Sequence, residues 1–164
     1  MTTATRIIQG LELEDRFDDL VLSCPKKTPI IAEGEYDAIV LSCRKERRFR
    51  RDLLAFKFRI VSQGAAFGVV LPGYANLEFG TGRGKQLPER SKLGIWLYRI
   101  QSFAPEVSVK RIHVKIFGAF QFVVRVATSR GLDDKNPLPA DEHSSQVTEI
   151  LGVTGRITGK GSGR

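Results

Sequence analysis

The chain has 164 residues and is 41% hydrophobic, so it can bury a core but is short for two domains. Its formal net charge of +8 favours an acidic partner. No apolar stretch reaches the roughly 18 residues of a membrane span, and the N-terminus leads into no signal-peptide core. Composition therefore predicts a soluble, cytoplasmic protein without a membrane partner.

The positive charge is concentrated in one part of the chain. Residues 1–43 hold 4 basic and 8 acidic side chains, a net charge of −4, whereas residues 44–59 hold 8 basic and 2 acidic, a net charge of +6. We expect an acidic N-terminal extension over 1–33, a single folded domain over 34–152, and a flexible, basic, Gly-rich tail over 153–164.

Two cysteines, Cys24 and Cys43, lie far apart in the sequence. Neither belongs to a C-x-x-C motif, and no histidines follow at zinc-finger spacing. This pattern favours a reduced intracellular protein and predicts no metal site at the cysteines.

Three strand signals open the folded domain, at Tyr36–Cys43, Leu53–Val61 and Phe67–Leu71. The third ends at Pro72 and Gly73, and a tight turn is expected at Gln63-Gly64. We therefore predict a three-stranded antiparallel meander. In the second strand apolar and cationic positions alternate, which gives a core face and an outer cationic face. The core positions are Leu54, Phe56, Phe58 and Ile60, and the outer positions include Lys57 and Arg59.

A strongly basic run lies between the first two strand signals, where a hairpin turn is expected. Its six cations cannot be buried in a turn and should attract a polyanion from solution, although such runs also occur as ordinary solvated loops. The run contains one aromatic ring, Phe49, which can stack on a base or fold back onto the protein. The cations are Arg44, Lys45, Arg47, Arg48, Arg50 and Arg51.

The segment from Asn76 to Arg90 alternates glycine with polar residues and predicts a mobile loop. Its Arg83 and Lys85 suit a flexible basic arm over a nucleic-acid strand, and an unstructured linker is the other interpretation. It is not a Walker phosphate loop, because Phe79 and Gln86 occupy positions where that motif has glycine and Ser or Thr.

A helix is predicted from Lys92 to about Phe103, capped by Ser91 and ended by Pro105, because apolar residues recur at helical spacing. Trp96 shares this apolar stripe, so we expect it in the core. Two further strands follow, Phe120–Ala127, with a start as early as His113, and Ser145–Leu151.

Three strands, a helix and two more strands are typical of the oligonucleotide-binding (OB) barrel, in which the helix lies between strands three and four. We therefore predict a mainly β, five-stranded OB-type barrel. OB barrels bind nucleic acid on the outer side of strands two and three and through the loops between strands one and two and strands four and five. The basic run and the cationic face fall in the first two of these places.

The segments Glu33–Ala38, Phe56–Ile60 and Phe122–Val126 resemble the single-stranded-DNA-binding OB proteins of bacterial mobile elements and phages. The resemblance covers residues 33–152, and it implies an OB fold and favours DNA over RNA. Housekeeping bacterial proteins of this kind usually end in an acidic tip that recruits partners, whereas this chain ends at Gly161–Arg164. Recruitment of replication partners by that route is therefore not implied.

The function expected is non-enzymatic, largely sequence-independent binding of single-stranded nucleic acid by a cationic groove and exposed rings. Tyr74, just beyond the third strand signal, is the second candidate ring, with packing at the barrel mouth as its alternative. The complete predicted set is Arg44, Lys45, Arg47, Arg48, Phe49, Arg50, Arg51, Lys57, Arg59, Tyr74, Arg83 and Lys85.

The alternative function is a protein-interaction or assembly module of a mobile element, whose basic patch binds an acidic protein surface. The N-terminal extension makes this credible, since its carboxylates could dock on the arginines of a neighbouring subunit. The sequence leaves homo-oligomerisation open. The carboxylates are Glu12, Glu14, Asp15, Asp18 and Asp19.

No catalytic motif and no cofactor site is expected. His113 and His143 lack a second histidine at ligand spacing, and both are interpreted as surface or structural residues. A group of carboxylates in a polar loop could hold magnesium in a nuclease, but a flexible segment does not supply the rigid ligands that metal catalysis needs. The group comprises Asp133, Asp134, Asp141 and Glu142.

Overall fold

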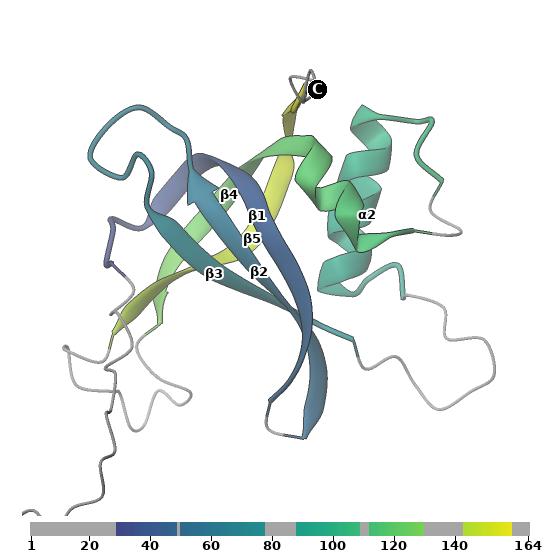
Figure 1. Cartoon of the computed structure of the whole chain (residues 1–164), viewed down its shortest axis with the longest axis horizontal. Helices are drawn as coiled ribbons and strands as arrows, with labels where there is room; N and C mark the ends of the chain where they lie inside the picture. Colours follow the sequence, from purple (N-terminus) through teal and green to yellow (C-terminus); the bar gives the residue numbers. More distant parts are fainter. Residues whose placement is uncertain (1–28, 49, 78–87, 109–111, 130–142, 159–164) are drawn as a thin grey trace, which may run out of the picture.

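The computed structural model describes residues 29–48, 50–77, 88–108, 112–129 and 143–158. Within them, five strands close in a ring in the order β1-β2-β3-β5-β4, with one helix, α2, between β3 and β4 (Figure 1). The strands are β1 (Gly34–Arg48), β2 (Arg51–Ile60), β3 (Val70–Asn76), β4 (Phe120–Ser129) and β5 (Ser144–Arg156), and the helix is α2 (Lys92–Phe103). The mainly β fold with this element order is confirmed.

The first three strands form the predicted antiparallel meander, but their bounds differ from the prediction, most clearly at β3 and at the β2–β3 connection. β3 does not end at Pro72-Gly73; it runs through both residues to Asn76. The β2–β3 connection is the longer segment 61–69 and not a tight turn at Gln63-Gly64. Proline is tolerated in a strand with a largely open edge, and β3 pairs with β5 at a single described position, Gly73 with Val147.

The core lies inside the ring and is rich in aromatic side chains. As predicted, Phe56, Phe58 and Trp96 are buried. The Trp96 ring meets Phe56 edge to face at 5.4 Å and Phe58 at 6.3 Å, so α2 inserts its apolar stripe among the β2 rings. Offset or edge-to-face contacts of this kind are favourable beyond the area they bury.

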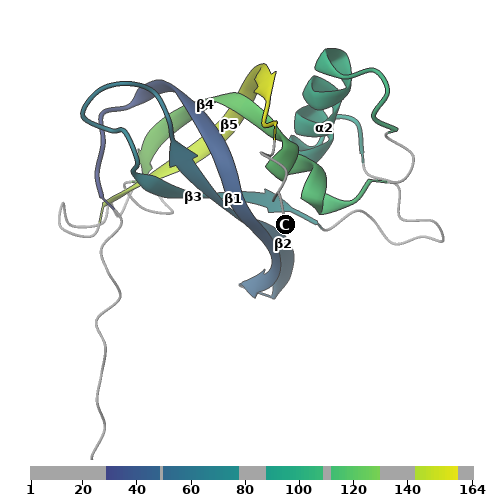
Figure 2. The ribbon, with the colours of Figure 1, turned by 45° about the horizontal axis from the view of Figure 1, so that its top comes forward.

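Helix α2 begins where the sequence predicts, because the Ser91 hydroxyl accepts a hydrogen bond from the Gly94 amide at 3.0 Å and so caps the first turn. It lies beside the strands at one side of the ring (Figures 1 and 2). No helix in the described part of the chain is long and apolar enough to cross a membrane.

A 3₁₀ helix, Val114–Ala119, precedes β4, so that strand begins at Phe120 and not as early as His113. β5 is longer than predicted and continues to Arg156, four residues into the segment expected as a flexible tail. The reason is pairing, since Arg156 lies opposite Phe120 on β4 and its guanidinium covers the Phe120 ring at 5.8 Å.

The last residues of the predicted acidic extension are attached to the ring. The Ile31 amide donates to the Ser145 hydroxyl at 2.9 Å, and the Thr128 amide donates to Glu33 at 3.0 Å. The rest of that extension, residues 1–28, lies outside the described residues.

Candidate nucleic-acid interface

The sequence predicted a loop for the basic run, but in the structure this run forms the end of a two-stranded ribbon. β1 continues to Arg48 and β2 begins at Arg51, and these two residues are paired. Residues 49–50 connect them, and Arg50 has a φ of 61°, a left-handed conformation suited to a two-residue hairpin. We call Arg44–Arg48 with Arg51–Ala55 the basic ribbon. Exposed strand positions keep the charges in water as well as a loop would, while cross-strand hydrogen bonds satisfy the backbone.

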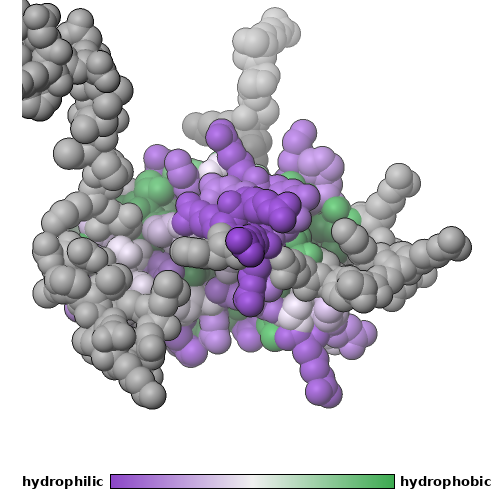
Figure 3. Space-filling view, turned by 90° about the horizontal axis from the view of Figure 1, so that it is seen from below, coloured by the Kyte–Doolittle hydropathy of each residue, from purple (hydrophilic) through white to green (hydrophobic). Residues whose placement is uncertain are grey.

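The basic ribbon projects away from the ring, because β1 leaves β4 after Ile39 while it stays paired with β2. Figures 1 and 2 show the ribbon extending beyond the other strands. Seen from below, in Figure 3, hydrophilic side chains are gathered where this end of the molecule faces the viewer. The projection makes the charges accessible from several directions.

Cations from the basic ribbon and from the middle of β2 share one outer face. Residues paired across strands lie on the same side of a sheet, and alternate residues along a strand do too. Arg44 pairs with Ala55 and Arg48 with Arg51, while Lys57 and Arg59 continue the same alternation along β2. We call these the cationic face, and all of its five cations are exposed: Arg44, Arg48, Arg51, Lys57 and Arg59.

Most of the cationic face has no acidic partner. The Lys57 side chain lies between Ser42 and Pro72, and Arg59 lies between Ile39 and Val70. Among the described residues, four of the five cations form no ion pair. These four are Arg44, Arg51, Lys57 and Arg59.

Two carboxylates neutralise part of the basic ribbon. Glu46 pairs with Arg48 at 2.9 Å, and Asp52 pairs with Lys45 at 3.7 Å on the other side of the ribbon. Exposed pairs of this kind stabilise the fold by at most about 1 kcal/mol. Arg47 and Arg50 are exposed as well, and neither forms an ion pair in the described part of the chain. The ribbon therefore retains a net positive charge.

Tyr74 lies within β3 and not beyond it, and its pairing with Ala55 puts it on the cationic face. The Arg48 guanidinium donates a hydrogen bond to the Tyr74 hydroxyl at 3.1 Å and lies 4.9 Å from the ring centroid. Partial desolvation lowers the pKa of Arg48, but attraction and hydrogen bonding to Tyr74 and Glu46 outweigh it and leave that pKa above its ordinary value. A half-buried ring and a guanidinium plane are thus held together.

Three predicted residues, Phe49, Arg83 and Lys85, lie outside the described residues, as do the four carboxylates of the polar loop. The structure also exposes a loop ring that the sequence did not suggest as a binding residue. Phe67, taken for the start of a strand, lies in the β2–β3 loop with 61% of its surface exposed. The run Phe67–Leu71 looks like a buried strand in sequence, so no signal there identified it.

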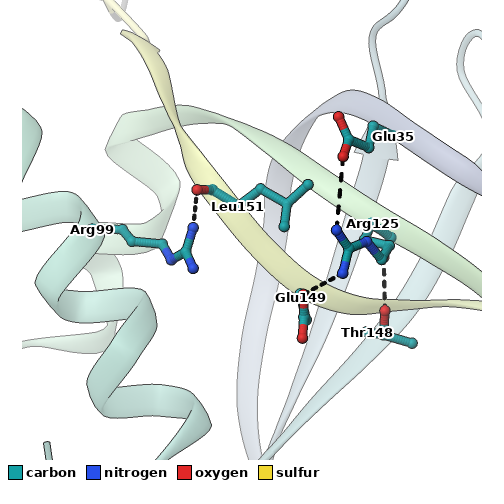
Figure 4. Close-up of polar contacts among 6 residues, drawn as sticks. All are labelled: Glu35, Arg99, Arg125, Thr148, Glu149 and Leu151. Carbon is teal, nitrogen blue, oxygen red and sulfur yellow. Dashed lines mark hydrogen bonds and ion pairs between the residues drawn. The ribbon is translucent and has the colours of Figure 1, made fainter. Parts of the chain in front are cut away.

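On the part of the ring formed by β4 and its neighbours β1 and β5, an exposed arginine has acidic partners (Figure 4). Arg125 on β4 lies between Glu35 on β1 and Glu149 on β5, at 3.8 Å and 3.0 Å. Its charge is locally balanced by both neighbouring strands. Beside this cluster, Arg99 of α2 donates to the backbone carbonyl of Leu151.

His113 and Cys43, which could in principle take part in chemistry, are held by the fold in structural roles. His113 caps the 3₁₀ helix by accepting a hydrogen bond from the Lys115 amide at 3.2 Å. Burial raises the pKa of the Cys43 thiol to about 11, so it is protonated and poorly nucleophilic at neutral pH. No group of three or more His, Cys, Asp or Glu suited to a metal ion occurs within the described ranges.

No family model, curated protein or solved structure matches this chain.

Proposed function

We propose that this protein binds single-stranded nucleic acid, DNA in preference to RNA, through the cationic face and the basic ribbon of an OB-type barrel. Binding is non-enzymatic and largely independent of sequence. The observation that carries the proposal is the alignment of unpaired cations and an aromatic ring on one outer face, at Arg44, Arg51, Lys57, Arg59 and Tyr74.

The topology supports the OB assignment. β1 pairs with both β2 and β4, β3 approaches β5 in parallel, and the helix lies between β3 and β4. These pairings and this element order are consistent with the five-stranded Greek-key barrel of the OB fold, whose nucleic-acid surface is the outer side of strands two and three and the neighbouring loops. The cationic face lies on the outer side of β2, which corresponds to that surface in the proposed barrel.

The dimensions of the face suit an extended strand of nucleic acid. From Arg51 to Arg59 along β2, at about 3.3 Å per residue, the cations span roughly 26 Å. Apolar and cationic positions are mixed there, since Pro72 lies opposite Lys57 and Val70 opposite Arg59. Cations can then contact phosphates while bases lie against apolar and aromatic groups. Preference for DNA rests on the resemblance to single-stranded-DNA-binding OB proteins alone.

Fluorescence anisotropy with labelled oligothymidine over a salt series tests the proposal. We expect tight binding at low salt, with log affinity falling by about 0.7 per neutralised phosphate for each decade of salt. Oligouridine and duplex DNA of the same length should compete less well. Absence of binding at low salt overturns the proposal. Equal competition by polyglutamate would show that any polyanion suffices, and would favour the protein-interaction alternative.

A further inference from the structure

The β2–β3 loop, residues 61–69, is firmly attached to the ring at both ends. The Val61 amide donates to the carbonyl of Asp37 at 2.8 Å, and the Gly68 amide donates to the carbonyl of Ile60 at 2.8 Å. Gly68 has a φ of +80°, a conformation that favours glycine and turns the chain back toward β3. The loop therefore has a defined, hydrogen-bonded conformation.

The same loop buries one apolar residue and exposes the next. Ala66 is 9% exposed and belongs to the core, whereas Phe67 is 61% exposed. The Phe67 amide donates to the Gly64 carbonyl at 3.2 Å, and the Val69 amide donates to the Ala66 carbonyl at 3.1 Å. Anchored by Ala66 and these bonds, the backbone leaves most of Phe67 in solvent, where it gains little of the stabilisation that full burial would give.

Phe67 belongs to the loop that joins β2 to β3 at the Arg59 end of the cationic face. It precedes Val70, the first residue of β3, which pairs with Arg59. Arg59 is the cation farthest along β2 from the ribbon tip, and the β2–β3 loop and the basic ribbon lie at opposite ends of β2 (Figure 1). The segment 61–69 carries no charged residue, so nothing in it repels a phosphate.

We infer that Phe67 is a base-stacking residue and marks one end of the nucleic-acid path. The path runs from Phe67 past Arg59 and Lys57 to Tyr74 and the basic ribbon. A ring is thus available at the loop end, a ring paired with a guanidinium at the ribbon end, and unpaired cations in between. This alternation is the arrangement that sequence-tolerant single-strand binding requires. The inference rests on the proposed function and extends it to a residue outside β1, β2 and β3.

Tyr98 provides a matched control. It is the most exposed of the large apolar and aromatic side chains in the described chain, at 68%, but it lies on α2, at the other side of the ring from the β2–β3 loop (Figure 1). A variant at Tyr98 therefore removes or replaces an exposed ring without touching the path. The comparison separates stacking at a particular place from general stickiness of exposed rings.

The first experiment measures affinity. Phe67→Ala should weaken oligothymidine binding by about 5- to 150-fold, the range expected for one lost base stack, with the salt slope unchanged because no charge is removed. Tyr98→Ala should bind like the wild type. If the wild type binds and Phe67→Ala binds equally well, this inference is wrong while the proposed function stands. If the wild type does not bind, the proposed function itself fails.

The second experiment reports contact directly. Phe67→Trp and Tyr98→Trp each add an exposed indole to the buried Trp96, which is 1% exposed and serves as a common background. Oligothymidine should quench the added emission of Phe67→Trp, with a midpoint that follows the anisotropy curve. Tyr98→Trp should be unaffected. Quenching absent from Phe67→Trp, or equal in both variants, would contradict stacking at the loop.

Discussion

The outer surfaces of β4 and of β2 each carry an exposed arginine, but in different surroundings. Arg125, on β4, is flanked across the sheet by Glu35 and Glu149, whereas Arg59, on β2, is flanked by Ile39 and Val70. Both arginines are exposed on strands. The charge of Arg125 is balanced by carboxylates within 4 Å, whereas the charge of Arg59 acts on the solvent. Local partners, more than the total net charge of +8, therefore determine where a polyanion would bind.

Removing the unpaired charges tests this difference most strongly. A variant with Arg44, Arg51, Lys57 and Arg59 changed to Gln should lose four phosphate contacts, which flattens the salt slope by about 2.8 and costs several hundred-fold in affinity near 0.1 M salt. Folding should be unaffected, because none of the four forms an ion pair with another described residue, and circular dichroism checks this. An unchanged salt slope in the anisotropy series would place the binding surface elsewhere.

The contact between β3 and β5 leaves no room for a side chain at Gly73. A Cβ added there would lie 2.6 Å from the Phe58 ring and 3.3 Å from the Val147 carbonyl oxygen. Gly73→Val should therefore lower the free energy of unfolding by about 1–3 kcal/mol, a usual cost of overpacking a core, as measured by urea denaturation. In Gly155→Ala the added Cβ meets nothing within 4 Å, which makes that variant the control. Equal stability of Gly73→Val and wild type would mean that β3 and β5 separate readily.

Tyr74 distinguishes a ring from a hydroxyl on the cationic face. Tyr74→Ala should weaken binding by about 1–3 kcal/mol if the ring stacks on a base. Tyr74→Phe keeps the ring and loses only the hydrogen bond from Arg48, so it should retain most of the affinity. If Phe is as damaging as Ala, Tyr74 acts by positioning Arg48 and not by stacking. Titrations of both variants at one salt concentration decide between the two roles.

Much of the frame could be predicted because local signals and tertiary packing agree there. Ser91 and the apolar stripe defined α2, and alternation in β2 separated Phe56 and Phe58 from Lys57. These patterns report which side of an element is buried, and burial dominates folding. The outer face of β2 was for the same reason identified correctly.

The site was only partly predictable, since pairing partners are not written in local composition. Charge density suggested a turn at Arg44–Arg51, but cross-strand bonds extend the strands almost to its end. Phe67 belongs to an apolar run that is typical of a buried strand, but it lies in a hydrogen-bonded loop that buries Ala66 and leaves Phe67 exposed. Likewise, nothing in the sequence near Arg125 shows that Glu35 and Glu149 flank it.

The smallest expected effect comes from single substitutions of Arg59 and Arg125, which compare the two surfaces directly. Arg59→Gln and Arg125→Gln each remove one exposed positive charge from a strand of the ring, so the change in net charge is identical. Arg59→Gln should reduce the salt slope by about 0.7, one phosphate contact, and weaken binding several-fold near 0.1 M salt. Arg125→Gln should leave affinity and slope unchanged, because Glu35 and Glu149 already cancel that charge, and should cost less than about 1 kcal/mol of stability. Equal losses in the two variants would mean that the protein attracts nucleic acid through its net charge, and that the cationic face is not a distinct site.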